Sequence, residues 1–244
     1  MSADAHAAAG PGMSKEIVLA EALRALLPTD VAVAGGPIAS AQGPLFAIEE
    51  RALTTAVHVR QIEFRAGRSY ARAALRQLGV PDQPIVQAAD RRPLWPDGFV
   101  GAISHSRALC AAAAASDASY LGLGLDLEPA TALDPELIPI VARPHESAAL
   151  CRRVVTEDAA VDCAKLLFCA KESVFKACYP LTLEWLDFQD VSIEFHAASD
   201  HFTATLEGTR VPLPGGPRID GRWSIADGHV LTAIAIRWPD AGMR

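Results

Sequence analysis

The segment from Tyr120 to Glu128 constrains this chain more than any other part of its sequence. Apolar residues and glycines run up to Pro129, which predicts a β-strand that stops there. Asp126 and Glu128 stand two positions apart near its end, and residues i and i+2 of a strand point to the same face. Neighbouring carboxylates repel each other unless a cation or a proton joins them. We therefore expect either a metal site at this strand end or a pair of solvated carboxylates before a turn.

A third carboxylate lies downstream, at Glu172. The segment from Phe168 to Lys176 carries apolar residues at roughly helical spacing, so Glu172 and Lys176, four positions apart, share a helix face. Carboxylate oxygens suit Mg²⁺ or Mn²⁺ rather than zinc. The pattern fits either a third metal ligand with a lysine beside it for phosphate, or an ordinary surface ion pair.

Two further features favour a phosphate ligand. His105 lies at a predicted junction of strand and turn, where a histidine can donate a hydrogen bond to a phosphate oxygen. Arg68, Arg72 and Arg76 recur every four residues on one predicted helix face, and a guanidinium group can bind two phosphate oxygens. A turn residue bonded to the backbone and a solvated helix face are the alternatives.

Together these features are the inventory for Mg²⁺-dependent chemistry on a cofactor that contains a pyrophosphate. The common nucleotide-binding fingerprints do not account for them. The sequence has no G-x-x-x-x-G-K-[ST] loop, and Gly122-x-Gly124 lacks the third glycine and the following helix of a dinucleotide-binding motif.

The length of 244 residues suits one large domain or two small ones of about 100–120 residues each. The 22 Lys and Arg against 29 Asp and Glu give a net charge of −7, which argues against a general nucleic-acid binder. Five cysteines without a C-x-x-C pair favour reduced thiols in the cytoplasm over a disulfide framework or a zinc site. No apolar run reaches the roughly 18–20 residues of a membrane span. Residues 1–13 are expected to form a disordered leader, not a secretory signal.

Two segments of the chain look alike. Gly101 to Ala115 and Gly221 to Ile236 are each predicted to be a strand, a polar turn and a second strand. Each follows a predicted helix, Arg68 to Leu78 in the first case and Ala159 to Cys178 in the second. The sequence thus suggests two related halves that meet near Asp126, although a chance match of two hairpins would give the same pattern.

In the first half, prolines and glycines predict where the helices and strands end. We expect a helix from Ser14 that Pro28 ends, a strand that ends at Gly35-Gly36, and a long helical stretch from Glu49 to Leu78 that breaks near Ala66-Gly67 and is capped by Gly79.

The motifs resemble those of a known family. Gly124-Leu-Asp126-Leu-Glu128, followed by Lys171-Glu172-Ser-Val-Phe-Lys176, is similar to the 4′-phosphopantetheinyl transferases. Pro93-Leu-Trp-Pro96 leading into Gly101 to Ser106, and the arginine helix from Arg68 to Leu75, resemble the subgroup that includes the enterobactin-synthase transferase and the actinobacterial type II enzymes. The matching segments extend from about Glu49 to Pro180.

The resemblance implies an α+β fold of two pseudo-symmetric halves, each a small antiparallel sheet packed with helices, with the active site in the cleft between them. The halves would be residues 14–125 and 126–244. The implied reaction transfers the 4′-phosphopantetheine arm of coenzyme A to a serine of an apo carrier protein and releases 3′,5′-ADP. The partners would be acyl, peptidyl or aryl carriers of fatty acid, polyketide, nonribosomal peptide or siderophore synthesis. A cytoplasmic monomer without nucleic-acid or membrane partners is expected.

The resemblance also assigns roles by position. Asp126, Glu128 and Glu172 would hold Mg²⁺, or Mn²⁺ in its place. Glu172 would also take the proton of the incoming serine, directly or through a water, and Lys176 would neutralise or protonate the leaving phosphate. Coenzyme A phosphates would contact Ser104, His105 and Lys171, its 3′-phosphate would contact Arg60 and Arg68, and one of Arg91 and Arg92 would supply a further basic contact.

Two other classes of function stay open on the residues alone. One is another Mg²⁺-dependent phosphotransferase or hydrolase that acts on a nucleotide. The other is a non-catalytic coenzyme A-binding protein, which the intact set of carboxylates and lysines disfavours.

Overall fold

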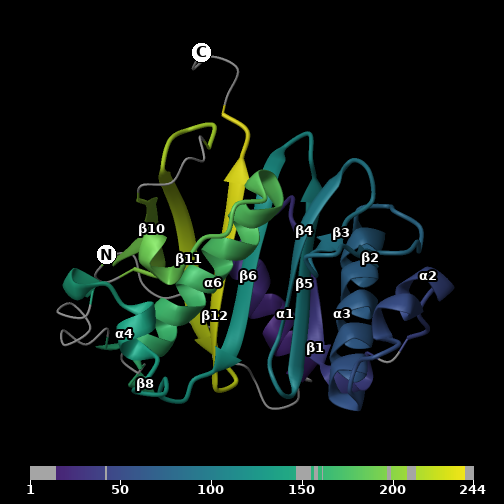
Figure 1. The fold of residues 1–244 in the computed structure, drawn as a ribbon, viewed down its shortest axis with the longest axis horizontal. Coiled ribbons are helices and arrows are strands. Elements are labelled where there is room, and N and C mark those ends of the chain that lie inside the picture. The colour runs from purple at the N-terminus through teal and green to yellow at the C-terminus, as the bar shows by residue number, and fades with distance from the viewer. Residues whose placement is uncertain are drawn as a thin grey trace, which may run out of the picture.

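The computed structural model describes residues 15–41, 43–146, 155–156, 159–160, 162–196, 199–207 and 213–239. The expected leader, residues 1–13, lies outside this part of the chain. The described residues form an α+β fold in which two antiparallel sheets stand side by side (Figure 1). The expected fold class is therefore confirmed.

The first sheet has the strand order β1-β5-β4, formed by Ala32–Pro37, Leu109–Ser116 and Phe99–His105. The second has the order β6-β12-β11-β10-β9, formed by Tyr120–Pro129, His229–Arg237, Arg218–Ala226, His201–Leu206 and Val191–Phe195. Two short pairs lie outside them: β2 with β3 (Val86–Gln87 and Pro93–Leu94), and β7 with β8 (Val155–Thr156 and Ala159–Ala160).

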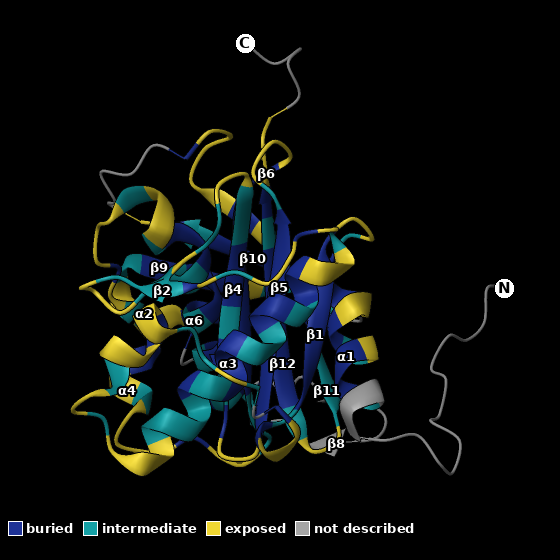
Figure 2. Ribbon diagram, turned by 90° about the vertical axis from the view of Figure 1, so that its right-hand side faces the viewer, coloured by how far each residue is buried: buried dark blue, intermediate teal, exposed yellow. Residues whose placement is uncertain are grey.

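The helices are α1 (Lys15–Leu26), α2 (Ala47–Glu50), α3 (His58–Gln77), α4 (Ile138–Val141) and α6 (Cys163–Thr182), with short 3₁₀ turns at Ile38–Ser40, Arg51–Leu53 and Phe188–Asp190. In Figure 1, α3 covers the first sheet and α6 covers the second. Leucines of α1 share a core with the apolar side chains of both sheets, so this helix joins the two halves. The strands of both sheets are the most buried part of the molecule (Figure 2).

The two halves repeat one order of elements. In the first, the strand β1 is followed by α3 and by the hairpin β4–β5, and β5 returns to pair with β1. In the second, β6 is followed by α6 and, after β9 and β10, by the hairpin β11–β12, and β12 returns to pair with β6. The predicted pseudo-symmetry rests on this shared order. The boundary predicted at Asp126 falls inside β6, whose ladder with β12 is continuous around that residue, so a division before Tyr120 fits the structure better.

The two faces of β6 carry different residues. Leu123, Leu125 and Leu127 are buried in the core that α1 shares with both sheets. Gly122 and Gly124 alternate with them and face α6, where a Cβ atom on Gly124 would lie 1.9 Å from the carbonyl oxygen of Ser173. A Cβ atom on Gly122 would lie 2.4 Å from the carbonyl oxygen of Ala177. The glycines thus let the backbone of α6 lie directly against the strand.

Several predicted elements are confirmed. A helix ends before Pro28, Gly79 follows α3 with a positive φ of 79°, and both predicted hairpins form. Two predicted breaks are wrong, because α3 runs unbroken through Gly67 and β1 continues through Gly35 and Gly36. These glycines serve close packing instead: a Cβ atom would lie 3.1 Å from an Ile103 methyl at Gly67 and 2.9 Å from Ala111 Cβ at Gly35.

The sequence predicts neither a disulfide framework nor a membrane span, and the structure allows both predictions to be examined in the described residues. None of the described cysteines forms a disulfide. Across the described ranges, no helix is both long enough and apolar enough to cross a membrane.

Gly124→Ala should strongly destabilise the fold. The new methyl group would meet the Ser173 carbonyl, and overpacking of this kind costs roughly 1–3 kcal/mol or more because a strand or a helix must move. Denaturant unfolding of the purified variant would measure the loss. Gly43→Ala is the matched control, since its nearest neighbour is the rotatable Ser69 hydroxyl at 3.0 Å. Equal midpoints for the two variants would show that the contact between α6 and β6 does not need glycine.

Candidate active site

The two sheets meet where β4 runs beside β6, and α6 lies on β6 and β12 next to this seam (Figure 1). Asp126 and Glu128 continue the glycine face of β6, since they follow Gly124 at steps of two residues. On α6, Glu172 and Lys176 each precede a residue, Ser173 or Ala177, that touches those glycines. The sequence thus places the carboxylates and the lysine at one helix–strand contact.

Asp126 is the centre of this site. It is 3% exposed, and its Oδ1 atom accepts hydrogen bonds from Lys176 Nζ at 2.6 Å and from Ser104 Oγ at 2.9 Å. Lys176 Nζ also donates to Ser104 Oγ at 3.1 Å. Ser104 belongs to β4 and the other two residues to β6 and α6, so this triangle joins the two halves.

The second carboxylate oxygen of Asp126 is buried and accepts no hydrogen bond from the N–H and O–H groups that the structure describes. A buried carboxylate oxygen without a donor is costly unless something positive binds it. Cys169 neighbours the same carboxylate, and burial, followed by the charge of Asp126 and a hydrogen bond between the thiol and that carboxylate, raises the pKa of the Cys169 thiol well above its ordinary value. The thiol therefore stays neutral and does not supply that charge.

The other two carboxylates lose their protons less readily than ordinary glutamates. Burial raises the pKa of Glu172, and Asp126 and Glu128 raise it further, against the opposing effect of Lys176. Burial and the charge of Asp126 likewise raise the pKa of Glu128. Burial opposes the charged form of Lys176, but Asp126 and Glu172 outweigh it and raise the pKa of that lysine. The site thus holds more negative charge than its residues balance well.

No three His, Cys, Asp or Glu side chains within the described ranges are already arranged to hold a metal ion. The donor set nevertheless fits a hard divalent cation in kind, because it consists of three carboxylates, one of which has a buried oxygen without a donor. In the present arrangement the Lys176 ammonium neutralises Asp126.

His105, at the end of β4, lies on the α3 side of this site. Its Nε2 atom is 2.9 Å from Arg60 Nη1 and 3.8 Å from Glu63 Oε2. Because an arginine N–H can only donate, Nε2 accepts and the ring is neutral. Burial lowers the pKa of His105, and Arg60 and Lys176 lower it further, against the effect of Glu63. The structure thus brings Arg60 and His105 together, close enough to Lys176 for its charge to affect the histidine.

The predicted arginine stripe on α3 is buried at Arg68 and Arg72, whereas Arg76 is exposed and pairs with Asp82. Arg68 is 5% exposed, lies 4.0 Å over the Phe64 ring and donates through Nε to the Ile85 carbonyl at 2.6 Å. Burial lowers the pKa of Arg68 to about 10. Its Nη2 atom is buried with no hydrogen-bond partner among the described residues, so it retains a donor for an anion.

The next arginine of the stripe has a structural role. Arg72 donates from Nη1 to both oxygens of Glu49, at 2.9 and 3.0 Å, and from Nη2 to the Pro44 carbonyl. Glu49 is fully buried and also accepts from the backbone N–H groups of Phe46 and Ile85. This pair holds the segment before α3 onto the helix, and no sequence signal identified Glu49 as its centre.

Lys171 does not reach the carboxylates. Its ammonium is buried and donates to Glu146 Oε2 at 2.7 Å and to the carbonyl oxygens of Val141 and Phe188, each at 2.8 Å. These contacts use all three of its donors. The predicted contact of Lys171 with a coenzyme A phosphate stays a prediction, and it would require Lys171 to give up at least one of these partners. Lys171 and Glu172 are adjacent, so their side chains leave the helix about 100° apart.

Arg91 and Arg92 lie in the loop between β2 and β3. Arg92 donates to Asp90 Oδ2 at 3.0 Å, and Tyr179 of α6 donates to the same oxygen at 3.1 Å. Arg91 is exposed and has a positive φ of 73°. The structure thus connects Arg92, rather than Arg91, to α6.

An aromatic cluster that the sequence analysis did not identify lies next to the carboxylates. Phe175 stacks on Tyr179 with ring centres 5.0 Å apart, and Trp185 meets Phe175 edge-on at 5.0 Å. Trp185 is 75% exposed, which is unusual for a residue of this size. Phe175 and Tyr179 follow Glu172 at helical spacing, so the cluster continues the carboxylate side of α6.

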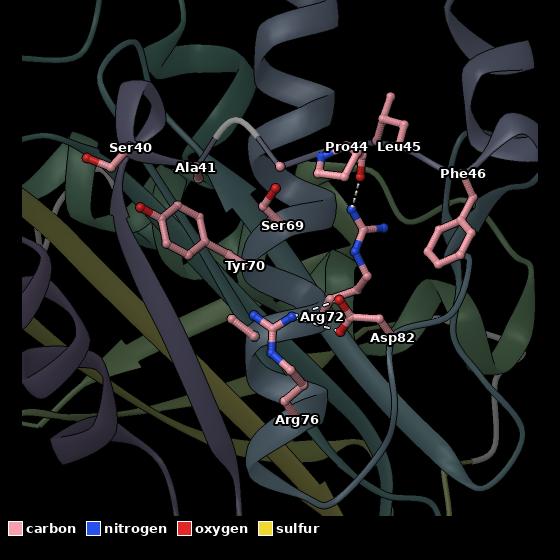
Figure 3. A pocket seen from close by; sticks show the side chains of 12 residues that line it. Ser40, Ala41, Pro44, Leu45, Phe46, Ser69, Tyr70, Arg72, Arg76 and Asp82 are labelled. Atoms are coloured by element: carbon pink, nitrogen blue, oxygen red, sulfur yellow. Dashed lines mark hydrogen bonds and ion pairs between the residues drawn. The ribbon is translucent and has the colours of Figure 1, made fainter.

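A pocket of about 480 Å³ lies away from the carboxylates, lined by residues of α3 and of the segment before α2, among them Tyr70, Arg72 and Phe46 (Figure 3). A second pocket, of about 200 Å³, follows the seam between the halves, with Arg92, Trp95, Gly122 and Pro180 in its lining. This second pocket lies along the seam that carries the carboxylates.

Comparison with known families covers both halves of the chain. The model of the 4′-phosphopantetheinyl transferase N-terminal domain matches residues 48–115, and the model of the 4′-phosphopantetheinyl transferase superfamily matches residues 122–214. The two regions meet at the turn before β6, in agreement with the sheet topology.

Individual relatives match most of the chain. The 4′-phosphopantetheinyl transferase PptT of Mycobacterium tuberculosis is 36% identical over 75% of this chain and 82% of its own length. The 4′-phosphopantetheinyl transferase Svp of Streptomyces mobaraensis is 39% identical over 80% of each chain. Enterobactin synthase component D of Salmonella typhimurium is 37% identical over 51% of each chain. The chain therefore belongs to the 4′-phosphopantetheinyl transferase superfamily.

Proposed function

We propose that this protein transfers the 4′-phosphopantetheine arm of coenzyme A to a serine of an apo carrier protein and releases 3′,5′-ADP. The observation that carries the proposal is the triangle of Asp126, Ser104 and Lys176 across the seam, with Glu128 and Glu172 beside it. Transfer from a diphosphate requires positive charge at both phosphates and a base at the nucleophile. Lys176 supplies one positive charge and Glu172 a candidate base, and the three carboxylates would hold the cation that supplies the remaining positive charge.

Asp126, Glu128 and Glu172 would together hold a divalent cation, Mg²⁺ in the first instance and Mn²⁺ as a substitute. When bound, the ion neutralises charge on the pyrophosphate and so favours attack on it. The buried free oxygen of Asp126 supports this assignment, as does the excess of carboxylates over lysines around it. Lys176 then has its donors available for the phosphate that leaves.

Glu172 is the proposed base. In the transfer step the serine oxygen bonds to the phosphorus of the arm, while the bond from that phosphorus to the oxygen of the 5′-phosphate breaks. The serine proton goes to Glu172, and Lys176 neutralises the phosphate of the departing 3′,5′-ADP. A carboxylate whose pKa is raised by burial accepts a proton more readily, which supports this role.

The nucleotide end of coenzyme A is assigned to the basic residues on the α3 side. Arg60 is 42% exposed and Arg68 keeps a free donor, so both suit the 3′-phosphate. His105, and Arg92 near the end of α6, suit the phosphates closer to the seam. The pantetheine arm, which has methylene and methyl groups between its amides, would lie over the Phe175, Tyr179 and Trp185 cluster, where the exposed Trp185 ring favours such a ligand.

The partners are proposed on the same basis. An acyl, peptidyl or aryl carrier protein would supply the serine. The enzyme is proposed to act as a cytoplasmic monomer, without nucleic acid or a membrane as a partner.

Intact-mass analysis of several apo carriers incubated with coenzyme A and Mg²⁺ tests the proposed function. Each accepted carrier should gain the mass of one phosphopantetheine arm. Asp126→Ala should lower the transfer rate about 100-fold or more, because a lost ligand removes several kcal/mol of transition-state stabilisation. Asp97→Ala, at an exposed position, is the control that should retain activity. Full activity of the Asp126→Ala protein would remove this carboxylate from the site.

Arg60→Gln should weaken coenzyme A binding about tenfold, the loss expected for one charge-assisted contact. It should affect dephospho-coenzyme A much less, because that molecule lacks the 3′-phosphate. Calorimetry with both ligands measures the difference, and Arg65→Gln on the same helix is the control for a lost positive charge. Equal losses with both ligands would place Arg60 away from the 3′-phosphate.

Glu172→Gln should separate activity from stability. Turnover should fall roughly 10²–10⁴-fold if the carboxylate takes the serine proton. Since the folded state raises the pKa of Glu172, its ionised form lowers the stability of the metal-free protein above that pKa. The variant should therefore melt at a higher temperature than the natural protein at pH 7–8.

This gain should shrink as the pH falls toward the ordinary glutamate value of 4.5, where Glu172 itself becomes neutral. Melting curves without metal across a pH series measure it. A variant that is less stable at every pH would show that the Glu172 charge is well compensated. Rescue of its turnover by added Mn²⁺ would instead assign Glu172 to metal binding alone.

A further inference from the structure

A second lysine of α6, Lys165, lies at the carboxylates and outside the motif from Lys171 to Lys176. Lys165 precedes Glu172 by seven residues, which is close to two helical turns and puts both on one face. Its Nζ atom is 4.0 Å from Glu128 Oε2 and 5.7 Å from the centre of the Phe168 ring. Its side chain is only 11% exposed. A lysine this enclosed normally has its charge well paired.

The pairing of Lys165 is incomplete. Its ammonium donates no hydrogen bond to any residue in the described ranges, and its single ion pair is at the long limit of such contacts. Lys171 on the same helix has three short hydrogen bonds, and Lys176 has two. The helix start is meanwhile fixed, since Asp162 Oδ1 accepts from the Lys165 backbone N–H at 2.7 Å. Among the residues that the structure describes, Lys165 thus has donors without a hydrogen-bond partner, on a backbone that is held at the helix start.

The position of Lys165 along the site indicates which anion it meets. Arg60, His105 and Lys176 lie on the side of Asp126 that faces α3. Lys165 lies at Glu128, two residues further along β6, on the side away from that nucleotide end. The two lysines therefore flank the carboxylates from opposite ends. If Lys176 meets the phosphate that leaves with the nucleotide, the phosphate nearer Lys165 is the one that is transferred.

We propose that Lys165 binds the phosphoryl group that is transferred from coenzyme A to the carrier serine. This inference rests on the proposed function of the site. Lys165 makes a hydrogen bond to an oxygen of that group before and after the bond to the nucleotide breaks. It neither gives nor takes a proton, and its charge offsets the negative charge on the group under attack.

The choice of ligands makes this testable, because 3′,5′-ADP contains the nucleotide and the leaving phosphate but not the transferred phosphoryl group. Calorimetry in Mg²⁺ should show coenzyme A binding weakened about tenfold by Lys165→Met and 3′,5′-ADP binding unchanged. Lys165→Arg should restore most of the affinity. Arg51→Met, an exposed site, controls for the loss of one positive charge.

Metal binding separates this role from an indirect effect through Glu128. Mn²⁺ affinity without coenzyme A, followed by electron paramagnetic resonance, should be equal or higher in Lys165→Met, since a competing positive charge is gone. Weaker Mn²⁺ binding would overturn the proposal and make Lys165 a positioning residue for Glu128. A melting curve of each variant shows that the protein used is folded.

Three other outcomes would also overturn the proposal. Equal weakening of coenzyme A and 3′,5′-ADP would place Lys165 at the nucleotide. A raised carrier KM with unchanged coenzyme A binding would assign it to the carrier surface. Unchanged binding and transfer would leave it a partner of Glu128 only. Failure of the natural protein to modify any carrier would instead contradict the proposed function, so the two failures are distinguishable.

Discussion

The close approach of α6 to β6 determines the rest of this structure. Gly122 and Gly124 leave no side chain between the strand and the carbonyl oxygens of Ala177 and Ser173, so the helix lies on the strand itself. The residues just beyond the glycines, Asp126 and Glu128, then meet the helix side chains next to those contacts. A single methyl group in this contact would push α6 away from β6, and Glu172 and Lys176 would move with the helix. Packing and chemistry therefore depend on the same pair of glycines.

The contact between α6 and β6 brings three carboxylates together at a site that is largely shielded from water. Asp126 is neutralised by a lysine from α6 and accepts a hydrogen bond from a hydroxyl of β4, which ties the two halves together at the site. Burial and the neighbouring carboxylates raise the pKa values of Glu128 and Glu172. Such a site is under-compensated as it stands, and a divalent cation with an anionic ligand is the natural complement. The folded protein therefore favours the binding of a cation at these carboxylates.

The lysines of α6 show how far sequence reasoning extends. Lys171 and Lys176 belong to the recognised motif, yet only Lys176 faces the carboxylates, while Lys171 is held by Glu146 about a quarter-turn away. Lys165 lies outside the motif but faces Glu128. The seven-residue spacing of Lys165 from Glu172 can be recognised in the sequence. The pairing of Lys171 with Glu146 cannot, because Glu146 comes from a separate segment whose place beside α6 is set by tertiary packing.

The two hairpins and the strand that carries Asp126 and Glu128 could be predicted from local periodicity and turn residues, whereas the α+β fold class came from the resemblance of the motifs. The family could also be predicted from the sequence, because its motifs are short and continuous along the chain. Only the tertiary structure decided that Gly35 and Gly67 serve packing instead of breaking their elements, that Arg72 is bound to Glu49, and that Lys171 is enclosed. The physical reason is that burial and pairing depend on neighbours distant in sequence, and the chain alone does not specify their positions.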